Sequence, residues 1–248
     1  MQLPEWWGTG NPYKIMDCIE GMDSIPDDSV DCFILDPPYS TGARDGTRSA
    51  RGKLIRADDR GWFLFDNMTT RGFTFFLRAV CLMILRKAKV GAFVHIFCDW
   101  RQCPNVMDIV ESAGLLLQNI IVWDKISFGM GVNYRNQHEF IVVASKGEPR
   151  QTKHDCANVI AVGRRKNPEH PTEKPEKLIE KLILTTTERG EIVVDPFLGS
   201  GATLEACRKT GRLGLGFEIS PDFEGIIRRR CEVSTPDLKD FESEEQTS

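Results

Sequence analysis

The chain has 248 residues, of which 41% are hydrophobic and 27% charged, and its formal net charge is −4 at pH 7. This composition excludes a disordered or membrane-embedded chain, and no apolar run reaches the length of a membrane span. The first residues lack the basic and apolar regions of a signal peptide, so a cytoplasmic location is expected. Eight cysteines without a Cys-x-x-Cys pair indicate reduced core thiols, and no disulfide framework or metal site is expected.

Apolar runs bounded by turn residues alternate with segments of helical periodicity along the chain. This alternation predicts one domain over residues 1–231, built on a mostly parallel sheet of about seven strands with helices on both faces. Strands are expected at 11–17, 30–35, 91–98, 115–123, 138–145, 192–194 and 212–218, with a minor strand at 158–162. Helices are expected at 73–89, 104–113, 176–187 and 221–231, and a further helix opens after residue 201.

Two inserted loops and a tail carry unbalanced charge. The loop at about 40–72 holds seven basic and four acidic residues between Ser40 and Arg71, and the loop at about 146–169 holds six and two between Lys146 and Lys166. The segment 232–248 is acidic and poor in apolar residues, which predicts a disordered tail. Two basic loops are compatible with a polyanionic partner, although a solvated charged surface is the usual explanation.

The strand expected at 30–35 ends abruptly in a short motif, which reads Asp36, Pro37, Pro38 and Tyr39. Since open α/β sheets bind ligands at the carboxyl ends of their strands, a site is expected here. A carboxylate and a proline carbonyl accept hydrogen bonds from an NH2 group, and a tyrosine stacks on a ring, so the motif suits a flat ring that bears an amine. A simple Asp-Pro turn after a core strand is the alternative.

A second motif joins the strand at 192–194 to a helix, and its residues are Asp195, Pro196, Phe197, Leu198, Gly199, Ser200, Gly201, Ala202 and Thr203. Its glycines let the backbone approach a ligand closely, and Glu218 ends the next strand, where an acid binds ribose hydroxyls in dinucleotide folds. The third glycine of the dinucleotide fingerprint and the Gly-Lys-Ser/Thr of a triphosphate loop are missing, which disfavours NAD and ATP. A ligand with ribose and no phosphate, such as S-adenosylmethionine, fits better; a purely structural glycine turn is the alternative.

In this order the two motifs resemble those of the β-class amino-methyltransferases of DNA, the N6-adenine and N4-cytosine enzymes. The similarity runs from about Tyr13 to Arg230 and includes residues 25–31, 133–139, 170–175 and 216–218. It implies an α/β, Rossmann-like class I methyltransferase fold that is circularly permuted, with S-adenosylmethionine as cofactor. Within the family Asp-Pro-Pro-Tyr leans toward adenine N6. Cytosine N4 is the alternative, and RNA is a less favoured substrate.

The resemblance also implies a role for each residue of the first motif. Asp36 and the carbonyl of Pro37, followed by Pro38, would hold the amine of a base flipped out of the duplex, on which Tyr39 would stack. Proximity to a sulfonium methyl group then suffices for in-line transfer, so neither a metal nor a nucleophilic cysteine is required.

The cofactor would lie against the second motif and two neighbouring segments. By resemblance, Glu218 would hold the ribose, and Asp17 would approach the adenine edge, although a turn acid at a strand end is an equally simple reading of Asp17. The residues implied for the methionine side are Thr172, Lys174, Asp195, Pro196, Phe197, Gly199, Ser200, Gly201 and Thr203.

The basic loops are the expected contacts with DNA phosphates, because the first of them directly follows the catalytic motif. The candidate contacts are Ser40, Arg44, Arg48, Arg51, Lys53, Arg135, Arg164, Arg165 and Lys166. A homodimer and a restriction endonuclease partner are compatible with this reading. The alternative from another class is a non-catalytic nucleic-acid-binding subunit on a methyltransferase fold, whose signature would be loss of the acid or of the glycine loop; both are intact here.

Overall fold

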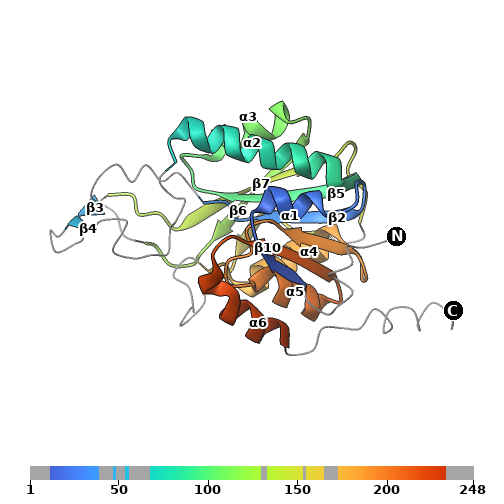
Figure 1. The fold of residues 1–248 in the computed structure, drawn as a ribbon. Helices are drawn as coiled ribbons and strands as arrows, with labels where there is room; N and C mark the ends of the chain where they lie inside the picture. Colours follow the sequence, from blue (N-terminus) through green and yellow to red (C-terminus); the bar gives the residue numbers. More distant parts are fainter. Residues whose placement is uncertain are drawn as a thin grey trace.

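The computed structural model describes residues 12–38, 47–48, 54–55, 68–129, 133–152, 155–164 and 173–232. Its centre is an eight-stranded sheet with the strand order β1-β10-β9-β2-β5-β7-β6-β8 (Figure 1). Neighbouring strands pair in parallel except at β7, which runs antiparallel to both β5 and β6. The strands of this sheet are β1 Tyr13–Ile15, β2 Val30–Leu35, β5 Ala88–Cys98, β6 Leu116–Asp124, β7 His138–Ser145, β8 Val159–Ala161, β9 Ile192–Asp195 and β10 Leu213–Glu218.

Helices cover both faces of this sheet, as Figure 1 shows. Helices α1, α2 and α3 pack on one face, whereas α4, α5 and α6 pack on the other. Their bounds are α1 Cys18–Asp23, α2 Thr70–Lys87, α3 Cys103–Ser112, α4 Glu176–Thr186, α5 Ala202–Thr210 and α6 Glu224–Glu232. None of the helices in these described ranges is long and apolar enough to cross a bilayer.

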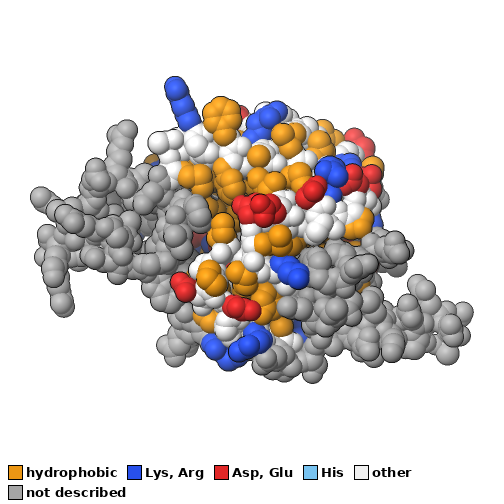
Figure 2. Space-filling model, in the orientation of Figure 1, with side chains coloured by type: hydrophobic (Ala, Val, Ile, Leu, Met, Phe, Trp, Pro, Cys, Tyr) orange, Lys and Arg blue, Asp and Glu red, His pale blue; other side chains and the backbone are white. Residues whose placement is uncertain are grey.

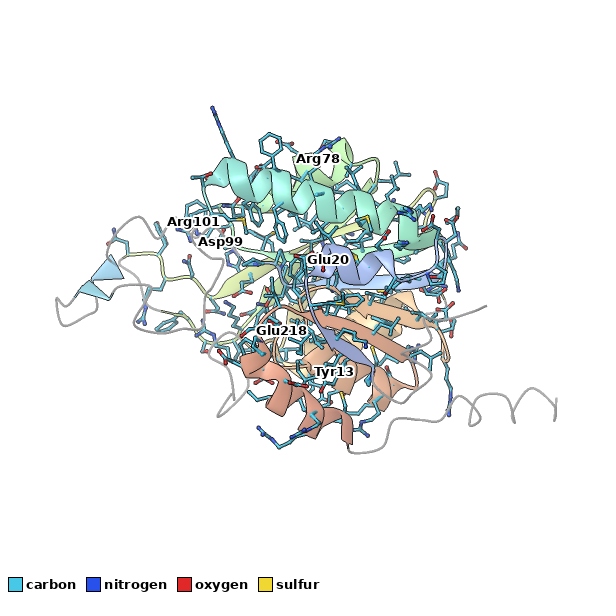
Figure 3. The ribbon with its side chains drawn as sticks, viewed as in Figure 1. Tyr13, Glu20, Arg78, Asp99, Arg101 and Glu218 are labelled. Atoms are coloured by element: carbon cyan, nitrogen blue, oxygen red, sulfur yellow. The ribbon has the colours of Figure 1, made fainter. Side chains whose placement is uncertain are left out.

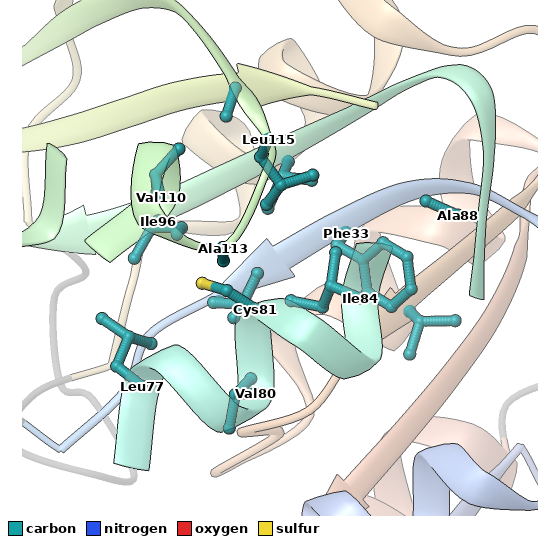
Figure 4. Packing of buried hydrophobic residues seen from close by; sticks show 14 of the residues in the cluster. Phe33, Leu77, Val80, Cys81, Ile84, Ala88, Ile96, Val110, Ala113 and Leu115 are labelled. Atoms are coloured by element: carbon teal, nitrogen blue, oxygen red, sulfur yellow. The ribbon is translucent and has the colours of Figure 1, made fainter. Parts of the chain in front are cut away.

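The central strand β2 is buried along its whole length because both of its faces are covered. Phe33 points into the core under α2, where it packs with Ile84 and other apolar side chains of that helix (Figure 4). The alternate residues Cys32 and Ile34 belong to the cluster under α4 and α5. A strand buried on both faces needs a continuous apolar run rather than an alternating one, which is why this run was recognisable in the sequence.

One charged side chain, Asp31, lies inside this apolar strand and is only 2% exposed. Its carboxylate pairs with Lys89 at 2.8 Å and with Arg150 at 3.4 Å. It also accepts a hydrogen bond from the backbone N–H of Ile192 at 3.0 Å. The acid therefore joins β2 to the start of β9 and to the segment after β7, far from the carboxyl edge of the sheet.

The order of elements predicted from the sequence is confirmed, with a few corrections. The eight strands of the sheet are the seven expected ones and the expected minor strand, β8, which extends the sheet beyond β6. The predicted loop at 40–72 contains a two-stranded antiparallel ribbon of β3 Thr47–Arg48 and β4 Leu54–Ile55. The last helix is divided into a 3-10 turn, η3 Pro221–Phe223, and α6, which reaches residue 232. Pro175 directly precedes α4, at its N-cap position.

Candidate active site

Four acidic side chains follow or end four consecutive strands at one edge of the sheet. Strands β1, β10, β9 and β2 are neighbours and parallel, so their carboxyl ends meet at this edge. The acids are Asp17, Glu218, Asp195 and Asp36 in that order across the sheet. Figure 3 marks Glu218 at the end of β10 and, further along the same edge, Asp99 and Arg101 after β5. The acids that the sequence predicted for the site are thus brought to one edge by the fold.

The carboxylate of Asp36 is held by a lysine from the segment that precedes α4. Lys174 Nζ donates to Asp36 Oδ2 at 2.5 Å and lies 5.2 Å from the centre of the Phe97 ring. The lysine side chain is 8% exposed and that of Asp36 is 28% exposed. Burial alone would lower the pKa of Lys174, but the carboxylates of Asp36 and Glu139 outweigh it and raise the pKa. Lys174 therefore stays protonated and fixes one oxygen of Asp36.

The rest of the first motif is described only in part. Pro37 is buried and Pro38 is half-buried directly after Asp36. Tyr39 lies outside the described residues, and so does Thr172 of the segment before α4. Their predicted roles in stacking and in cofactor binding remain predictions.

The glycine loop after β9 is organised by the buried carboxyl group of Asp195. Its Oδ1 accepts the backbone N–H of Phe197 at 2.9 Å, and its Oδ2 accepts the Thr203 hydroxyl at 2.5 Å. Burial, with smaller contributions from the charges of Asp36 and Glu218, raises the pKa of Asp195 to about 7. Asp195 is therefore poised to change its charge near neutral pH.

Gly199 and Gly201 both require the left-handed backbone region in this loop, with φ of +53° and +86°. A side chain is strained at such angles, which explains the choice of glycine. Among the described residues, no heavy atom lies within 4 Å of the position that a Cβ at Gly199 would take. At Gly201 the backbone of α6 is close, with Ile227 Cα 3.5 Å from that position. Gly201 thus allows helix packing, whereas Gly199 borders open space.

Glu218, at the end of β10, is hydrogen-bonded to the glycine loop that follows the neighbouring strand β9. Its Oε2 accepts the Gly199 N–H at 2.7 Å and its Oε1 accepts the Ser220 N–H at 2.8 Å. Burial raises the pKa of Glu218, against the opposing effect of these N–H donors. Since a carboxylate has about four acceptor positions, each oxygen retains capacity for a further donor such as a hydroxyl.

Ser200 of the same loop is bound by the last helix. Arg230 of α6 donates to Ser200 Oγ at 2.9 Å and pairs with Glu173 at 2.5 Å. The Glu173 side chain is fully buried and its neighbour in the chain is Lys174. The glycine loop and the segment that carries Lys174 are therefore fastened to one guanidinium.

The remaining predicted cofactor residues lie in this loop and just after β1. Pro196 is buried, and the ring of Phe197 packs edge-on against Phe76 of α2 at 5.8 Å. Asp17 caps α1, where it accepts the N–H of Ile19 at 2.8 Å. Its carboxylate thus has a structural role as a helix cap, and its contact with a cofactor stays a prediction.

Two further residues lie at this edge. Lys125 had no predicted role, and Glu139 belongs to the segment 133–139 of the family resemblance without an assigned role. Glu139 begins β7 and lies opposite Trp123 of β6, and Lys125 just after β6 pairs with its Oε1 at 2.5 Å. The other oxygen, Oε2, lies 3.6 Å from Lys174 Nζ. Because β7 is reversed, its beginning lies where the other strands end. A pattern that predicts a strand without its direction could not indicate this.

The predicted DNA contacts are mostly outside the described residues. Arg135 and Arg164 are described and exposed. The guanidinium of Arg135 lies 4.2 Å from the centre of the Phe128 ring and donates to the Gly129 carbonyl at 2.7 Å. Of Arg48 only the backbone, in β3, is described. The predicted contacts without a described position are Ser40, Arg44, Arg51, Lys53, Arg165 and Lys166.

The face crossed by α1 and α2 carries charges of both signs. Figure 2 shows acidic, basic and hydrophobic side chains interspersed there among the described residues. Such a mixed surface lacks the clustered cations of a DNA-binding face, at least over the part of it that is described. The carboxyl edge with Arg135 is the better candidate.

Comparisons with known proteins point to one family for this chain. The sequence model of the N6/N4 methyltransferase family, described as DNA methylase, matches residues 30–229. The protein YubD of Escherichia coli strain K12 is 29% identical over 214 residues, which cover 86% of this chain and 87% of YubD.

Solved structures share the fold at lower identity. The M1.HpyAVI–SAM complex has a TM-score of 0.65 and 22% identity, covering 88% of this chain and 98% of the other. The cytosine-N4-specific PvuII DNA methyltransferase has a TM-score of 0.71 and 16% identity, covering 92% and 88%. Since the matched range 30–229 includes both Asp36 and the glycine loop, this chain belongs to the N6/N4 DNA methylase family.

Proposed function

We propose that the chain transfers a methyl group from S-adenosylmethionine to the N6 amine of an adenine that is flipped out of DNA. That it is a DNA methyltransferase follows from its family; the base and the residue roles are the proposal. The observation that carries it is the Asp36 carboxylate, fixed by Lys174 at the end of β2 and at the same edge as the glycine loop.

The glycine loop and Glu218 suit a ligand with ribose hydroxyls and no phosphate. Each Glu218 oxygen accepts one backbone N–H and has capacity for one hydroxyl, and the adjacent Gly199 borders open space among the described residues. The residues that would hold S-adenosylmethionine are thus Glu218, the loop from Asp195 to Thr203 and, by prediction, Asp17. The bound cofactor supplies a methyl group on a positively charged sulfur, which makes that methyl group electrophilic.

The chain's own residues would prepare the amine. An exocyclic amine is a weak nucleophile because its lone pair is delocalised into the ring. Asp36 and the Pro37 carbonyl would accept its two hydrogens, which favours localisation of the lone pair on nitrogen, and Tyr39 would stack on the ring. As the new N–C bond would form, the bond between the methyl carbon and sulfur would break, and the electron pair would stay on sulfur in S-adenosylhomocysteine. The amine would become cationic and release one proton toward Asp36 or solvent.

Identification of the methylated nucleoside tests this proposal directly. DNA of mixed sequence is incubated with the full chain and S-adenosylmethionine labelled in its methyl group, then digested and analysed by mass spectrometry. Label in N6-methyladenine supports the proposal. Label in N4-methylcytosine alone would replace adenine with the cytosine reading, which the fold likeness to a cytosine-N4-specific enzyme keeps as the second candidate.

The affinity for S-adenosylmethionine should fall as the pH drops below about 7. Burial raises the pKa of Asp195 to about 7, so its negative charge is lost below that pH, and a neutral carboxyl group attracts a cationic ligand less. Calorimetric titrations at pH 8 and pH 6 should differ by up to about tenfold in Kd, the factor for one pH unit below a controlling pKa. Asp195→Asn should bind more weakly at pH 8 and show a flatter profile. An equally steep profile in that variant would assign the effect to another group.

A further inference from the structure

Two carboxylates and two ammonium groups form a row of alternating charge at the carboxyl edge. Asp36 Oδ2 lies 2.5 Å from Lys174 Nζ, which in turn lies 3.6 Å from Glu139 Oε2. The other Glu139 oxygen lies 2.5 Å from Lys125 Nζ. The order is therefore Asp36, Lys174, Glu139, Lys125, with formal charges that cancel.

Glu139 lies within strand β7, and Lys125 directly follows β6. Glu139 is in register with Trp123 in the β6–β7 ladder, and the Lys125 N–H continues that ladder by donating to the Gln137 carbonyl at 3.0 Å. Each ammonium also lies over an aromatic ring, Lys125 over Trp123 at 5.1 Å and Lys174 over Phe97 at 5.2 Å. Glu139 is thus held in a fixed place relative to Asp36.

Burial makes the members of the row depend on one another. The side chains of Lys174 and Lys125 are 8% and 10% exposed, and that of Glu139 is 21% exposed. A buried charge is costly unless an opposite charge compensates it. Glu139 Oε2 is buried and accepts no hydrogen bond from the described residues, so the Lys174 ammonium at 3.6 Å compensates that oxygen. Glu139 therefore attracts an ammonium that also serves Asp36.

We propose that Glu139 is a positioning residue for methyl transfer, because it shares the Lys174 ammonium with Asp36 and so limits how far Lys174 neutralises the acceptor of the amine. The inference rests on the proposed role of Asp36. If Asp36 were its only carboxylate partner in the row, the Lys174 ammonium would neutralise more of the Asp36 charge. It would also compete with the amine hydrogens for the carboxylate oxygens. With Glu139 on its other side, Lys174 still orients the Asp36 oxygen, while the carboxylate remains a strong acceptor.

The test compares three variants of the full chain at position 139. Glu139→Gln keeps the size and loses the charge, and it should lower kcat for methyl transfer roughly tenfold, as do changes to groups that orient a reacting residue. The Kd of S-adenosylmethionine should stay close to that of the unchanged chain, whereas the melting temperature should fall, because Glu139→Gln leaves the buried Lys125 ammonium without this carboxylate. Glu139→Asp keeps the charge and should retain more activity than Glu139→Gln, whereas Glu139→Ala should resemble Glu139→Gln. A normal kcat in Glu139→Gln would overturn the proposal.

A double variant separates this role from mere compensation of Lys125. In Glu139→Gln with Lys125→Gln, the unpaired Lys125 charge is gone, but Lys174 still has Asp36 as its only carboxylate in the row. The double variant should therefore remain as impaired in kcat as Glu139→Gln. Recovery of kcat in the double variant would show that Glu139 serves only Lys125, and the proposal would be wrong.

Failure of this inference is distinguishable from failure of the proposed function. The nucleoside that carries the label decides between adenine and cytosine, whereas the inference depends only on the ratio of kcat values. Asp36→Asn is included as a reference. If Asp36→Asn is inactive and Glu139→Gln is normal, only the inference fails; if Asp36→Asn is active, the role of Asp36 fails and the inference with it.

Discussion

Replacement of Asp36 by asparagine is expected to lower methyl transfer by about 10³-fold or more, within the range known for loss of a positioned acid–base group. Asparagine keeps the shape but offers only one weaker acceptor oxygen and an NH2 group that would oppose the amine of the base. It also leaves Lys174 with Glu139 as its remaining carboxylate in the row. Single-turnover transfer of labelled methyl groups to DNA measures the loss.

Measurement of cofactor binding should distinguish loss of the amine acceptor from a general loss of the folded structure. The glycine loop and Glu218 do not depend on Asp36 for the hydrogen bonds that hold them, so the Kd of S-adenosylmethionine should change little in Asp36→Asn. Asp99→Asn is the matched control, since Asp99 follows β5 at the same edge and pairs with Arg101 at 2.6 Å. Transfer should be nearly unchanged in that control. Activity in Asp36→Asn close to that of the control would contradict the acceptor role.

Replacement of Asp31 by alanine should lower the free energy of unfolding by about 3 kcal/mol or more, because it breaks a buried ion pair from one side. Asp31 is 2% exposed, and its loss leaves Arg150 and the Ile192 N–H without this partner. Urea denaturation followed by circular dichroism measures the change, with an unchanged slope as evidence for a two-state comparison.

The exposed ion pair of Asp23 provides the contrast. Its side chain is 66% exposed and that of its partner Arg86 is 52% exposed. Such pairs contribute at most about 1 kcal/mol, so Asp23→Ala should be close to neutral. If the two variants lost similar stability, burial would not be the reason that Asp31 matters.

The positions of Asp36, Asp195 and Glu218 could be predicted because each depends on a local pattern. Each acid directly follows or ends an apolar run, and the periodicity of such runs marks buried strands. Strand alternation with helices then brings the ends of parallel strands to one edge. The glycine loop was recognisable for the same reason, since Gly199 and Gly201 adopt backbone angles that other residues avoid.

The ion pairs of the site could not be predicted, because they join residues that are distant in the chain. Asp36 and Lys174 are 138 positions apart, and their contact depends on how the segment before α4 crosses the edge of the sheet. Glu139 reaches the row only because β7 is antiparallel to its neighbours, and its sequence reads as an ordinary buried strand. The ion pairs of Asp31 could not be predicted either, since its partners lie in other elements.

The contacts of Arg230 bear on the order in which the site forms during synthesis. Asp36 leaves the ribosome early, and the glycine loop follows much later. Ser200 and Glu173, which fix the loop and the neighbour of Lys174, both depend on a guanidinium in the last described helix. A nascent chain that already contains every strand of the sheet would therefore still lack this fastening. The fastening of the glycine loop and of the segment that carries Lys174 is thus complete only after translation has passed α6.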